Sequence, residues 1–200
     1  VGINRSAPTD AEKAIKAVGR KFFDLRADVG QTDKLAGLVD QAVQLAGRID
    51  ILVNNAGIIR RQDAIDFTEK DWDDVMDVNL KSVFFLSQAV ARQLIAQGQG
   101  GKIINIASML SFQGGIRVPS YTSSKSGVLG LTRLMANEWA KHGINVNAIA
   151  PGYMDTNNTE AIRADAQRNA EILGRIPAGR WGLPEDMAGP VVFLASQASN

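Results

Sequence analysis

The chain has 200 residues, of which 45% are hydrophobic and 22% are charged, a composition that suits one globular domain with a substantial core. Its 22 basic and 21 acidic side chains leave a net charge of +1, so no overall field favours nucleic acid or an anionic membrane as a partner. The absence of cysteine excludes disulfides, thiolate metal sites and a cysteine nucleophile. We recognise no signal peptide and no apolar run long enough to cross a bilayer, and we expect a cytoplasmic protein that handles a small molecule.

The predicted elements alternate between short apolar runs and longer stretches with helical spacing. Runs rich in Ile and Val predict strands at residues 1–3, 21–28, 49–56, 102–108 and 144–150. Helical periodicity predicts helices near residues 8–18, 32–46, 68–97, 121–142, 157–173 and 184–196. This order indicates an α/β fold, a Rossmann-like doubly wound parallel sheet with helices on both faces, because nearly continuous apolar strands are typical of sheets covered from both sides.

The predicted fold lacks elements that a doubly wound fold normally has at its two ends. A doubly wound dinucleotide-binding fold begins with a strand and a glycine-rich turn that holds the pyrophosphate, and the sequence has neither before the strand at 1–3. The glycine-rich "QGQGG" at 97–101 follows a helix and precedes a strand, the reverse of a phosphate-binding turn. We therefore expect residues 1–200 to form a single, incomplete domain whose first strand, glycine-rich turn and last strand are absent from this chain. Within it, residues 153–182 are expected to form a substrate lid.

A tyrosine and a lysine stand four positions apart in "YTSSK", at the predicted start of a helix. Residues at this spacing share one helix face, so Tyr121 and Lys125 can bring a phenol and an ammonium together. A neighbouring positive charge lowers the pKa of a phenol from its usual value of about 10, which would let the tyrosine exchange protons near neutral pH. The alternative is a helix-start aromatic beside a solvated surface lysine, and the pair by itself does not decide between the two.

Five motifs occur in order along the chain, and together they favour the functional interpretation of Tyr121 and Lys125. They are "NNAG" at 54–57, "VNLKS" at 78–82, "NIAS" at 105–108, "YTSSK" at 121–125 and "NAIAPGYMDT" at 147–156. In this order they resemble the short-chain dehydrogenase/reductase family, and the resemblance covers nearly the whole chain. It implies an NAD(P)-dependent oxidoreductase that acts on a CH–OH group.

The resemblance also implies a set of catalytic residues. Tyr121 would be the general acid/base, and Lys125 would lower its pKa and bind the ribose hydroxyls of the cofactor. Ser108, thirteen positions before the tyrosine, would hydrogen-bond the substrate oxygen. Asn79 would hold a water in a proton relay behind the lysine; an asparagine inside a long helix is unfavourable unless its side chain has such a local role. No metal is expected.

Residues at the ends of the predicted strands would bind the dinucleotide if the resemblance holds. The expected contacts are Asn4, Arg5, Asp28, Val29, Asn55, Ala56, Gly57, Tyr121, Lys125, Pro151, Gly152, Met154 and Thr156. An acidic residue after the second strand of such folds binds the ribose 2′-hydroxyl, whereas a basic one suits a 2′-phosphate. Here "VGINRS" offers Asn4 and Arg5, so NAD is the expected cofactor and NADP the alternative.

The resemblance is strongest to the branch of the family that acts on deoxy sugar acids in pectin and uronate breakdown. The expected substrate is therefore 2-deoxy-D-gluconate or 2-dehydro-3-deoxy-D-gluconate, with gluconate or another alcohol of the family's range as the alternative. Because a sugar acid carries a carboxylate, its pocket needs a fixed cation or donor. Arg117 is the candidate cation, with Gln113 and Asn158 as polar helpers beside Ser108 and Tyr121. The other reading of Arg117 is a loop arginine that faces water.

Three other expectations concern assembly and competing functions. Members of this family commonly form homotetramers through the helices that correspond to residues 68–97 and 121–142, and both helices are apolar enough to do so. A serine hydrolase would need a G-x-S-x-G elbow and a histidine base, and the chain lacks the elbow and places its one histidine, His142, at a helix end. A family member or fragment that binds a dinucleotide without turning it over is the remaining alternative.

Overall fold

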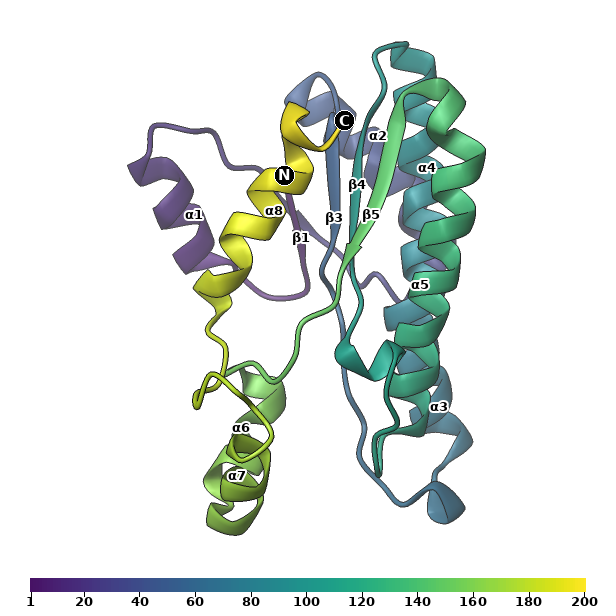
Figure 1. Cartoon of the computed structure of the whole chain (residues 1–200). Helices are drawn as coiled ribbons and strands as arrows, with labels where there is room; N and C mark the ends of the chain where they lie inside the picture. Colours follow the sequence, from purple (N-terminus) through teal and green to yellow (C-terminus); the bar gives the residue numbers. More distant parts are fainter.

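The computed structural model describes all residues, 1–200, and arranges parallel strands and helices in layers (Figure 1). Its strands are β1 (Gly2–Asn4), β2 (Asp24–Arg26), β3 (Ile51–Asn54), β4 (Gly101–Ile106) and β5 (Ile144–Ile149). Its main helices are α1 (Thr9–Ala17), α2 (Leu35–Ala46), α3 (Glu69–Met76), α4 (Ser82–Gln97), α5 (Pro119–Trp139), α6 (Glu160–Ala164), α7 (Ala166–Leu173) and α8 (Ala188–Ala195). The predicted α/β class is confirmed, and every predicted strand is present.

Two predicted boundaries were wrong for local reasons. The helix expected over residues 157–173 is broken at Asp165, whose backbone is extended (ψ 109°) and whose side chain caps α7 by accepting a hydrogen bond from the Arg168 N–H at 3.0 Å. The predicted strand at 21–28 contains only the three residues of β2 in regular pairing. An aspartate cap inside a helical pattern is a stop signal that outweighs the periodicity around it.

The strands form two parallel sheets. β1 pairs with β2, and the central sheet has the order β3-β4-β5 with Asn54 opposite Asn105 and Ile106 opposite Ile149. No ladder joins β1 to β3, and the side chains of Ile51 and Val53 on β3 are exposed. In the doubly wound strand order 3-2-1-4-5-6, this is the place of the first strand. The observed order therefore fits the predicted fold with that strand left out.

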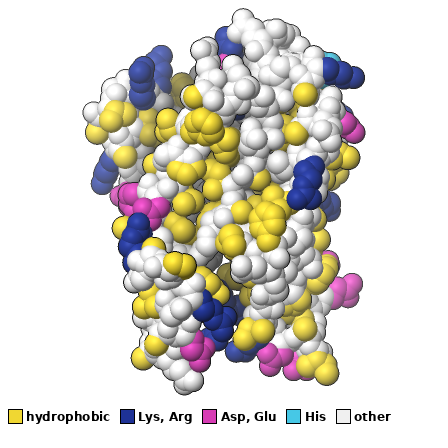
Figure 2. Space-filling view, viewed as in Figure 1, with side chains coloured by type: hydrophobic (Ala, Val, Ile, Leu, Met, Phe, Trp, Pro, Cys, Tyr) yellow, Lys and Arg dark blue, Asp and Glu magenta, His cyan; other side chains and the backbone are white.

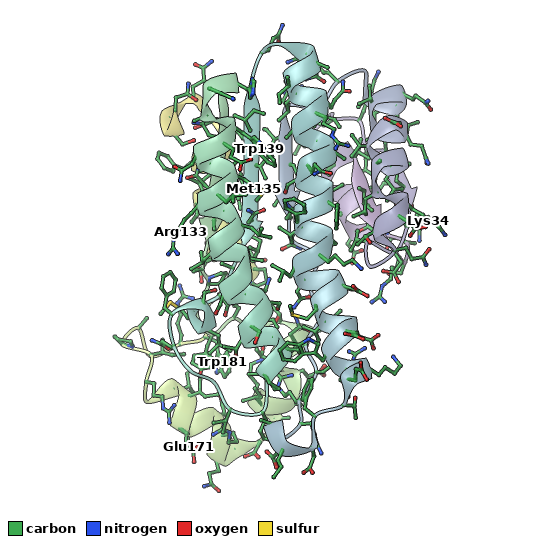
Figure 3. The ribbon with its side chains drawn as sticks, turned by 90° about the vertical axis from the view of Figure 1, so that its right-hand side faces the viewer. Lys34, Arg133, Met135, Trp139, Glu171 and Trp181 are labelled. Carbon is green, nitrogen blue, oxygen red and sulfur yellow. The ribbon has the colours of Figure 1, made fainter.

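The main core lies on one face of the central sheet, under α2, α4 and α5. Its buried side chains are Leu35, Leu38, Val39, Leu86, Val90, Ala91, Leu94, Ile103, Met135, Ile144 and Val146. Figure 3 shows α4 and α5 side by side, with Met135 and Trp139 on α5. α8 lies across the other face of the sheet and has no buried residue; its Val192 and Phe193 are exposed, in the region where hydrophobic side chains gather in Figure 2.

A chain of hydrogen-bonded, buried polar side chains links strands β3 and β4 to helices α4 and α5. The Asn54 amide donates to Ser87 Oγ on α4 at 2.9 Å and to Asn105 Oδ1 on β4 at 2.8 Å. The Asn105 amide donates in turn to Thr132 Oγ1 on α5 at 2.9 Å. Because each member of the chain has a partner, the network fixes two strands and two helices relative to one another at little cost.

Two glycine turns meet at the end of the sheet opposite to the carboxyl ends of the strands. Gly100 and Gly143 precede β4 and β5, and both have left-handed backbones with φ of 68° and 70°. A Cβ on Gly100 would lie 2.3 Å from the Gly143 carbonyl oxygen. Side chains are therefore excluded here both by conformation and by contact.

We expect Gly100→Ala to destabilise the fold more than Gly98→Ala does, by about 2 kcal/mol. Gly98 is the matched control because its φ is 70° and nothing lies within 4 Å of its Cβ position, so its substitution costs only the left-handed conformation, about 1 to 2 kcal/mol. Urea unfolding of both variants measures the difference. Equal losses of unfolding free energy in the two variants would mean that the turns at Gly100 and Gly143 can move apart at little cost.

Candidate active site

The predicted catalytic residues converge at the carboxyl ends of the central strands, the end near the lid in Figure 1. Ser108 follows β4 and caps a short 3-10 turn, Met109–Ser111, by accepting a hydrogen bond from the Leu110 N–H at 3.1 Å. Tyr121 and Lys125 lie one turn apart near the start of α5, whose first residue is Pro119. Ser108 and Lys125 are buried, and Asn79 is fully buried. Ligands of open parallel sheets bind at this end.

Three features of its surroundings shift the pKa of the Tyr121 hydroxyl. Burial raises the pKa of the phenol above 10, while a hydrogen bond with the Ser108 side chain and the positive charge of Arg61 lower it. Burial is the largest of the three, so the pKa of Tyr121 is raised overall. The predicted pairing of the Tyr121 phenol and the Ser108 hydroxyl around a substrate oxygen stays a prediction.

Lys125 does not act on Tyr121 as the sequence predicted. Its Nζ lies 5.7 Å from the centre of the Tyr121 ring and donates to the Ile106 carbonyl oxygen at 2.5 Å. Burial lowers the pKa of Lys125 itself from 10.5 to about 8. The pKa of Tyr121 is therefore raised where the sequence predicted it to be lowered, because burial outweighs the other influences and Lys125 is not among the groups that shift it.

Asn79 lies in a single π-helical turn, Asp77–Lys81, between α3 and α4. Its Oδ1 accepts the Ile58 N–H at 2.8 Å, and its Nδ2 donates to the Ile58 carbonyl oxygen at 2.9 Å. The side chain therefore holds the segment that follows β3. A π turn often marks a functional site, and the local role expected of this asparagine is, in the structure, the anchoring of Ile58. Its predicted water-holding role stays a prediction.

The expected cofactor residues line one hollow of about 220 Å³. The lining includes Asn4, Arg5, Asp28, Val29, Ala56 and Gly57, and it is completed by Ile3, Ala27, Ile58 and Val78. These residues come from β1, β2 and β3 and the segments that follow them, and Val78 comes from the π turn. A Cβ on Gly57 would stand 3.5 Å from Asn79 Oδ1 and 3.8 Å from Lys125 Nζ, which places this segment next to both side chains. The binding of a dinucleotide by these residues stays a prediction.

The remaining expected cofactor residues lie beside this hollow or at the neck of the lid. Asn55 follows β3 without lining the hollow. The Pro151 carbonyl oxygen accepts the Met109 N–H at 3.0 Å, which joins the loop after β5 to the turn that starts at Ser108, and Gly152 follows it. Met154 pairs with Gly182 in an isolated bridge, and Thr156 opens the turn before α6. Pro151 and Gly152 thus lie next to the turn that Ser108 begins, and their contact with a nicotinamide stays a prediction.

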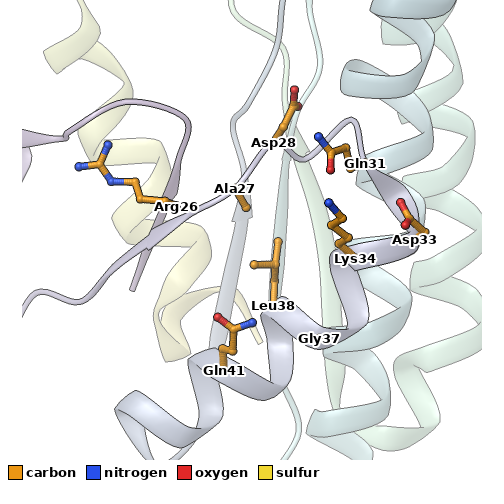
Figure 4. A pocket seen from close by; sticks show the side chains of 9 residues that line it. All are labelled: Arg26, Ala27, Asp28, Gln31, Asp33, Lys34, Gly37, Leu38 and Gln41. Carbon is orange, nitrogen blue, oxygen red and sulfur yellow. The ribbon is translucent and has the colours of Figure 1, made fainter.

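A second, larger hollow of about 580 Å³ is formed between β2 and α2 (Figure 4). It is lined by Arg26, Ala27, Asp28, Gln31, Asp33, Lys34, Gly37, Leu38 and Gln41. It shares Ala27 and Asp28 with the smaller hollow and contains none of the predicted catalytic residues. Asp28, whose Oδ1 accepts the Gly30 N–H at 2.9 Å, therefore stands on the wall between the two.

Residues 153–182, the predicted lid, form a small folded unit whose two ends are joined. The Asp155 N–H donates to the Gly182 carbonyl oxygen at 2.7 Å, and the Gly182 N–H donates to the Tyr153 carbonyl oxygen at 2.9 Å. The rings of Tyr153 and Trp181 meet edge to face with centres 5.6 Å apart. Between these ends lie α6 and α7, with Ile172 buried; Figure 3 shows Trp181 and Glu171 on this unit.

The predicted substrate cation, Arg117, is already paired. Its Nε lies 3.1 Å from Asp63 Oδ1, and both side chains are more than half exposed. Gln113 is exposed, and Asn158 offers its backbone carbonyl oxygen to Arg61 at 2.9 Å. The structure therefore does not bring Arg117 to Tyr121 as a free cation.

Arg61 is the cation that the sequence analysis missed. Its charge lowers the pKa of Tyr121, its side chain is exposed, and no carboxylate lies within ion-pair distance of it. Its neighbour Arg60, by contrast, lies near Asp71 and Asp74 at 3.4 and 3.5 Å. A signal was available, because Arg61 follows the carboxyl end of β3, where open parallel sheets place ligand contacts.

Known proteins resemble this chain over its whole length. The family model described as Enoyl-(Acyl carrier protein) reductase matches residues 1–200. A 2-dehydro-3-deoxy-D-gluconate 5-dehydrogenase of Escherichia coli (strain K12) is 70% identical over 200 residues, which are all of this chain and 79% of that protein. The protein of the same description from Dickeya dadantii (strain 3937) is 68% identical over the same shares.

Solved structures agree with the sequence relatives. The crystal structure of a putative 2-deoxy-D-gluconate 3-dehydrogenase from Agrobacterium tumefaciens, with bound NADP, is 58% identical and superposes with a TM-score of 0.91. The match covers 98% of this chain and 78% of that one. The chain therefore spans about four fifths of the length of these proteins.

Proposed function

Because this chain belongs to the short-chain dehydrogenase/reductase family, we propose that Tyr121, Ser108 and Lys125 manage the proton in a hydride exchange between a nicotinamide cofactor and a sugar acid. The chain is an NAD(P)-dependent oxidoreductase that acts on a sugar acid. The observation that supports the residue roles is the convergence of Ser108, after β4, with Tyr121 and Lys125, at the start of α5, where the Lys125 Nζ lies 5.7 Å from the centre of the Tyr121 ring.

The chemistry divides between cofactor and protein. When bound, the nicotinamide exchanges a hydride with the carbon that bears the reacting hydroxyl. In the oxidation direction, Ser108 holds the substrate oxygen and Tyr121 accepts its proton as a phenolate. Lys125, fixed by the Ile106 carbonyl oxygen, lies where it can donate to ribose hydroxyls. Asn79 keeps Ile58 and the cofactor-facing segment in place.

Arg61 is the proposed contact for the substrate carboxylate. A sugar acid brings a negative charge that needs a cation or donor, and Arg61 offers one beside the reacting phenol. The Arg61 guanidinium donates only to the Asn158 carbonyl oxygen of the lid, so a carboxylate can join this contact without displacing another anion. We propose Arg61 in this role in place of Arg117.

We expect Arg61→Ala to raise KM for 2-dehydro-3-deoxy-D-gluconate by roughly 10- to 100-fold, the range of a lost charge-assisted hydrogen bond. The matched control is Arg60→Ala, which removes the adjacent arginine that already lies near Asp71 and Asp74, and it should change KM little. Initial rates followed at 340 nm give both values.

The same variant should also shift the pH profile. Arg61 lowers the pKa of Tyr121, and oxidation needs the phenolate, so the rising limb of kcat/KM should move to higher pH when that charge is lost. An unchanged KM and an unchanged pH profile in Arg61→Ala would remove Arg61 from the site.

The finer cofactor choice rests on Asn4 and Arg5. We propose NAD as the preferred cofactor, with Asn4 bonding the ribose 2′-hydroxyl; NADP, paired through Arg5, is the alternative favoured by the Agrobacterium structure. Titration of the protein with both dinucleotides decides between them, and tighter binding of NADP would reverse the preference.

Assembly and biological setting remain proposals. We propose a homotetramer formed through α4 and α5, supported by the exposed Phe85 and Leu134 on these helices; sedimentation at the monomer mass would contradict it. We also propose a role in pectin breakdown, supported by the substrate of the relatives. A cytoplasmic location stays a prediction. No helix in the structure is both long and apolar enough to span a membrane.

A further inference from the structure

Arg117 has a backbone conformation that its neighbours must enforce. It is the one non-glycine residue with a positive φ, 64°, and it lies between an exposed loop and the buried Val118 that precedes α5. Such a conformation is disfavoured for a residue with a side chain and persists only where surrounding contacts fix it. The contacts that Arg117 makes are with Gln62 and Asp63, the two residues directly after Arg61.

Two links join Arg117 to the residues directly after Arg61. The Gln62 N–H donates to the Arg117 carbonyl oxygen at 3.1 Å, and the Arg117 Nε forms an ion pair with Asp63 Oδ1 at 3.1 Å. On the other side of Arg61, the Asn79 amide binds both backbone groups of Ile58. Arg61 is therefore held between two fixed points, one on the π turn and one on the segment leading into α5.

We propose that Arg117 is a positioning residue that fixes the segment of Arg61 relative to the start of α5, the helix that carries Tyr121. Arg117 precedes Tyr121 by four residues, so pinning Gln62 and Asp63 to it ties the loop of Arg61 to the helix of the phenol. An exposed ion pair by itself contributes little. The backbone hydrogen bond and the left-handed turn supply the rest, because together they fix the direction in which the Arg117 carbonyl points. This inference rests on the proposed carboxylate contact of Arg61.

The competing reading is direct contact, in which the free nitrogens of the Arg117 guanidinium touch the substrate. The two readings differ in one measurable respect. A positioning residue acts only through Arg61, so its removal has no further effect once Arg61 is gone. A direct contact contributes independently of Arg61.

The test is a double-mutant cycle on KM for 2-dehydro-3-deoxy-D-gluconate. We expect Arg117→Ala, which removes the ion pair and keeps the backbone hydrogen bond, to raise KM by roughly 2- to 5-fold with kcat nearly unchanged, and to add nothing in an Arg61→Ala background. Asp63→Ala should give a similar but smaller rise, which the combined Asp63→Ala and Arg117→Ala variant does not exceed. The carboxamide analogue of the substrate should be insensitive to Arg117→Ala.

Two further measurements separate positioning from a general loss of structure. Arg117→Gly removes the guanidinium but accepts the positive φ without strain, so it should raise KM without lowering the melting temperature. Arg117→Ala should also move the rising limb of the pH profile upward, as Arg61→Ala does, because the charge beside the phenol is no longer held there.

The possible results distinguish this inference from the function on which it rests. The same KM increase in both backgrounds, or no increase in either, overturns the positioning role while leaving Arg61 as the contact. An effect of Arg117→Ala combined with none of Arg61→Ala overturns both, and makes Arg117 itself the carboxylate contact.

Discussion

Tyr121→Phe will lower kcat by roughly 10²- to 10⁴-fold, the usual contribution of a positioned general acid or base. The substitution removes one hydroxyl and keeps the ring that packs near Lys125, so cofactor affinity should stay within a few-fold of the parent. Initial rates at 340 nm with 2-dehydro-3-deoxy-D-gluconate, together with a fluorescence titration of the cofactor, measure the two quantities separately.

The chain offers a matched control for this experiment. Tyr153 is its only other tyrosine and packs against Trp181 at the neck of the lid, so Tyr153→Phe tests loss of a phenol away from the proton-transfer position. It should retain most of kcat. A Tyr121→Phe variant with near-normal turnover would refute the general acid/base assignment. A parent protein that binds the dinucleotide but turns over no sugar acid would favour the non-catalytic alternative.

Lys125→Met should abolish most activity and yet make the protein more stable. Lys125 is buried, and its pKa falls from 10.5 to about 8 because burial disfavours the ammonium. That shift corresponds to about 3 kcal/mol of destabilisation at neutral pH. The hydrogen bond to the Ile106 carbonyl oxygen offsets about 1 to 2 kcal/mol of this. A methionine of similar length should therefore raise stability by about 1 to 2 kcal/mol, measured by urea unfolding at pH 7.

The pH dependence of this gain has a definite sign. Below pH 8, Lys125 is charged in both the folded and the unfolded protein, and the folded state carries the full penalty. Between about pH 8 and 10.5 the unfolded chain holds more protons than the folded one, so the stability of the parent rises with pH. The advantage of Lys125→Met should thus shrink from pH 7 to pH 10. A variant less stable than the parent at pH 7 would contradict the assigned penalty.

The sequence predicted the frame of the site because that frame depends on local patterns. Alternating apolar runs indicated parallel strands, and the strand ends indicated where Ser108 and the residues of the cofactor hollow would meet. The lysine and tyrosine of α5 share a face because of their spacing alone. These features follow from periodicities of two and 3.6 residues, which can be read directly from the chain.

The sequence could not predict which charges remain free after folding. The sequence alone does not distinguish Arg60, Arg61 and Arg117 from one another. Only the fold places aspartates beside Arg60 and Arg117. The sign of the Tyr121 pKa shift was wrong for a similar reason. Spacing brought an ammonium near the phenol, but burial, which depends on the whole fold, is the largest influence on the pKa of both groups.

The joined ends of the lid affect the strength of substrate binding. A loop that hung from two distant hinges would have to give up many conformations each time it covered a ligand, and affinity would fall accordingly. Here the bridge between Met154 and Gly182 and the edge-to-face contact of Tyr153 and Trp181 join the two ends of residues 153–182. We propose that this segment covers the substrate as a preformed unit, at a smaller entropic cost than a loop with separate ends would have.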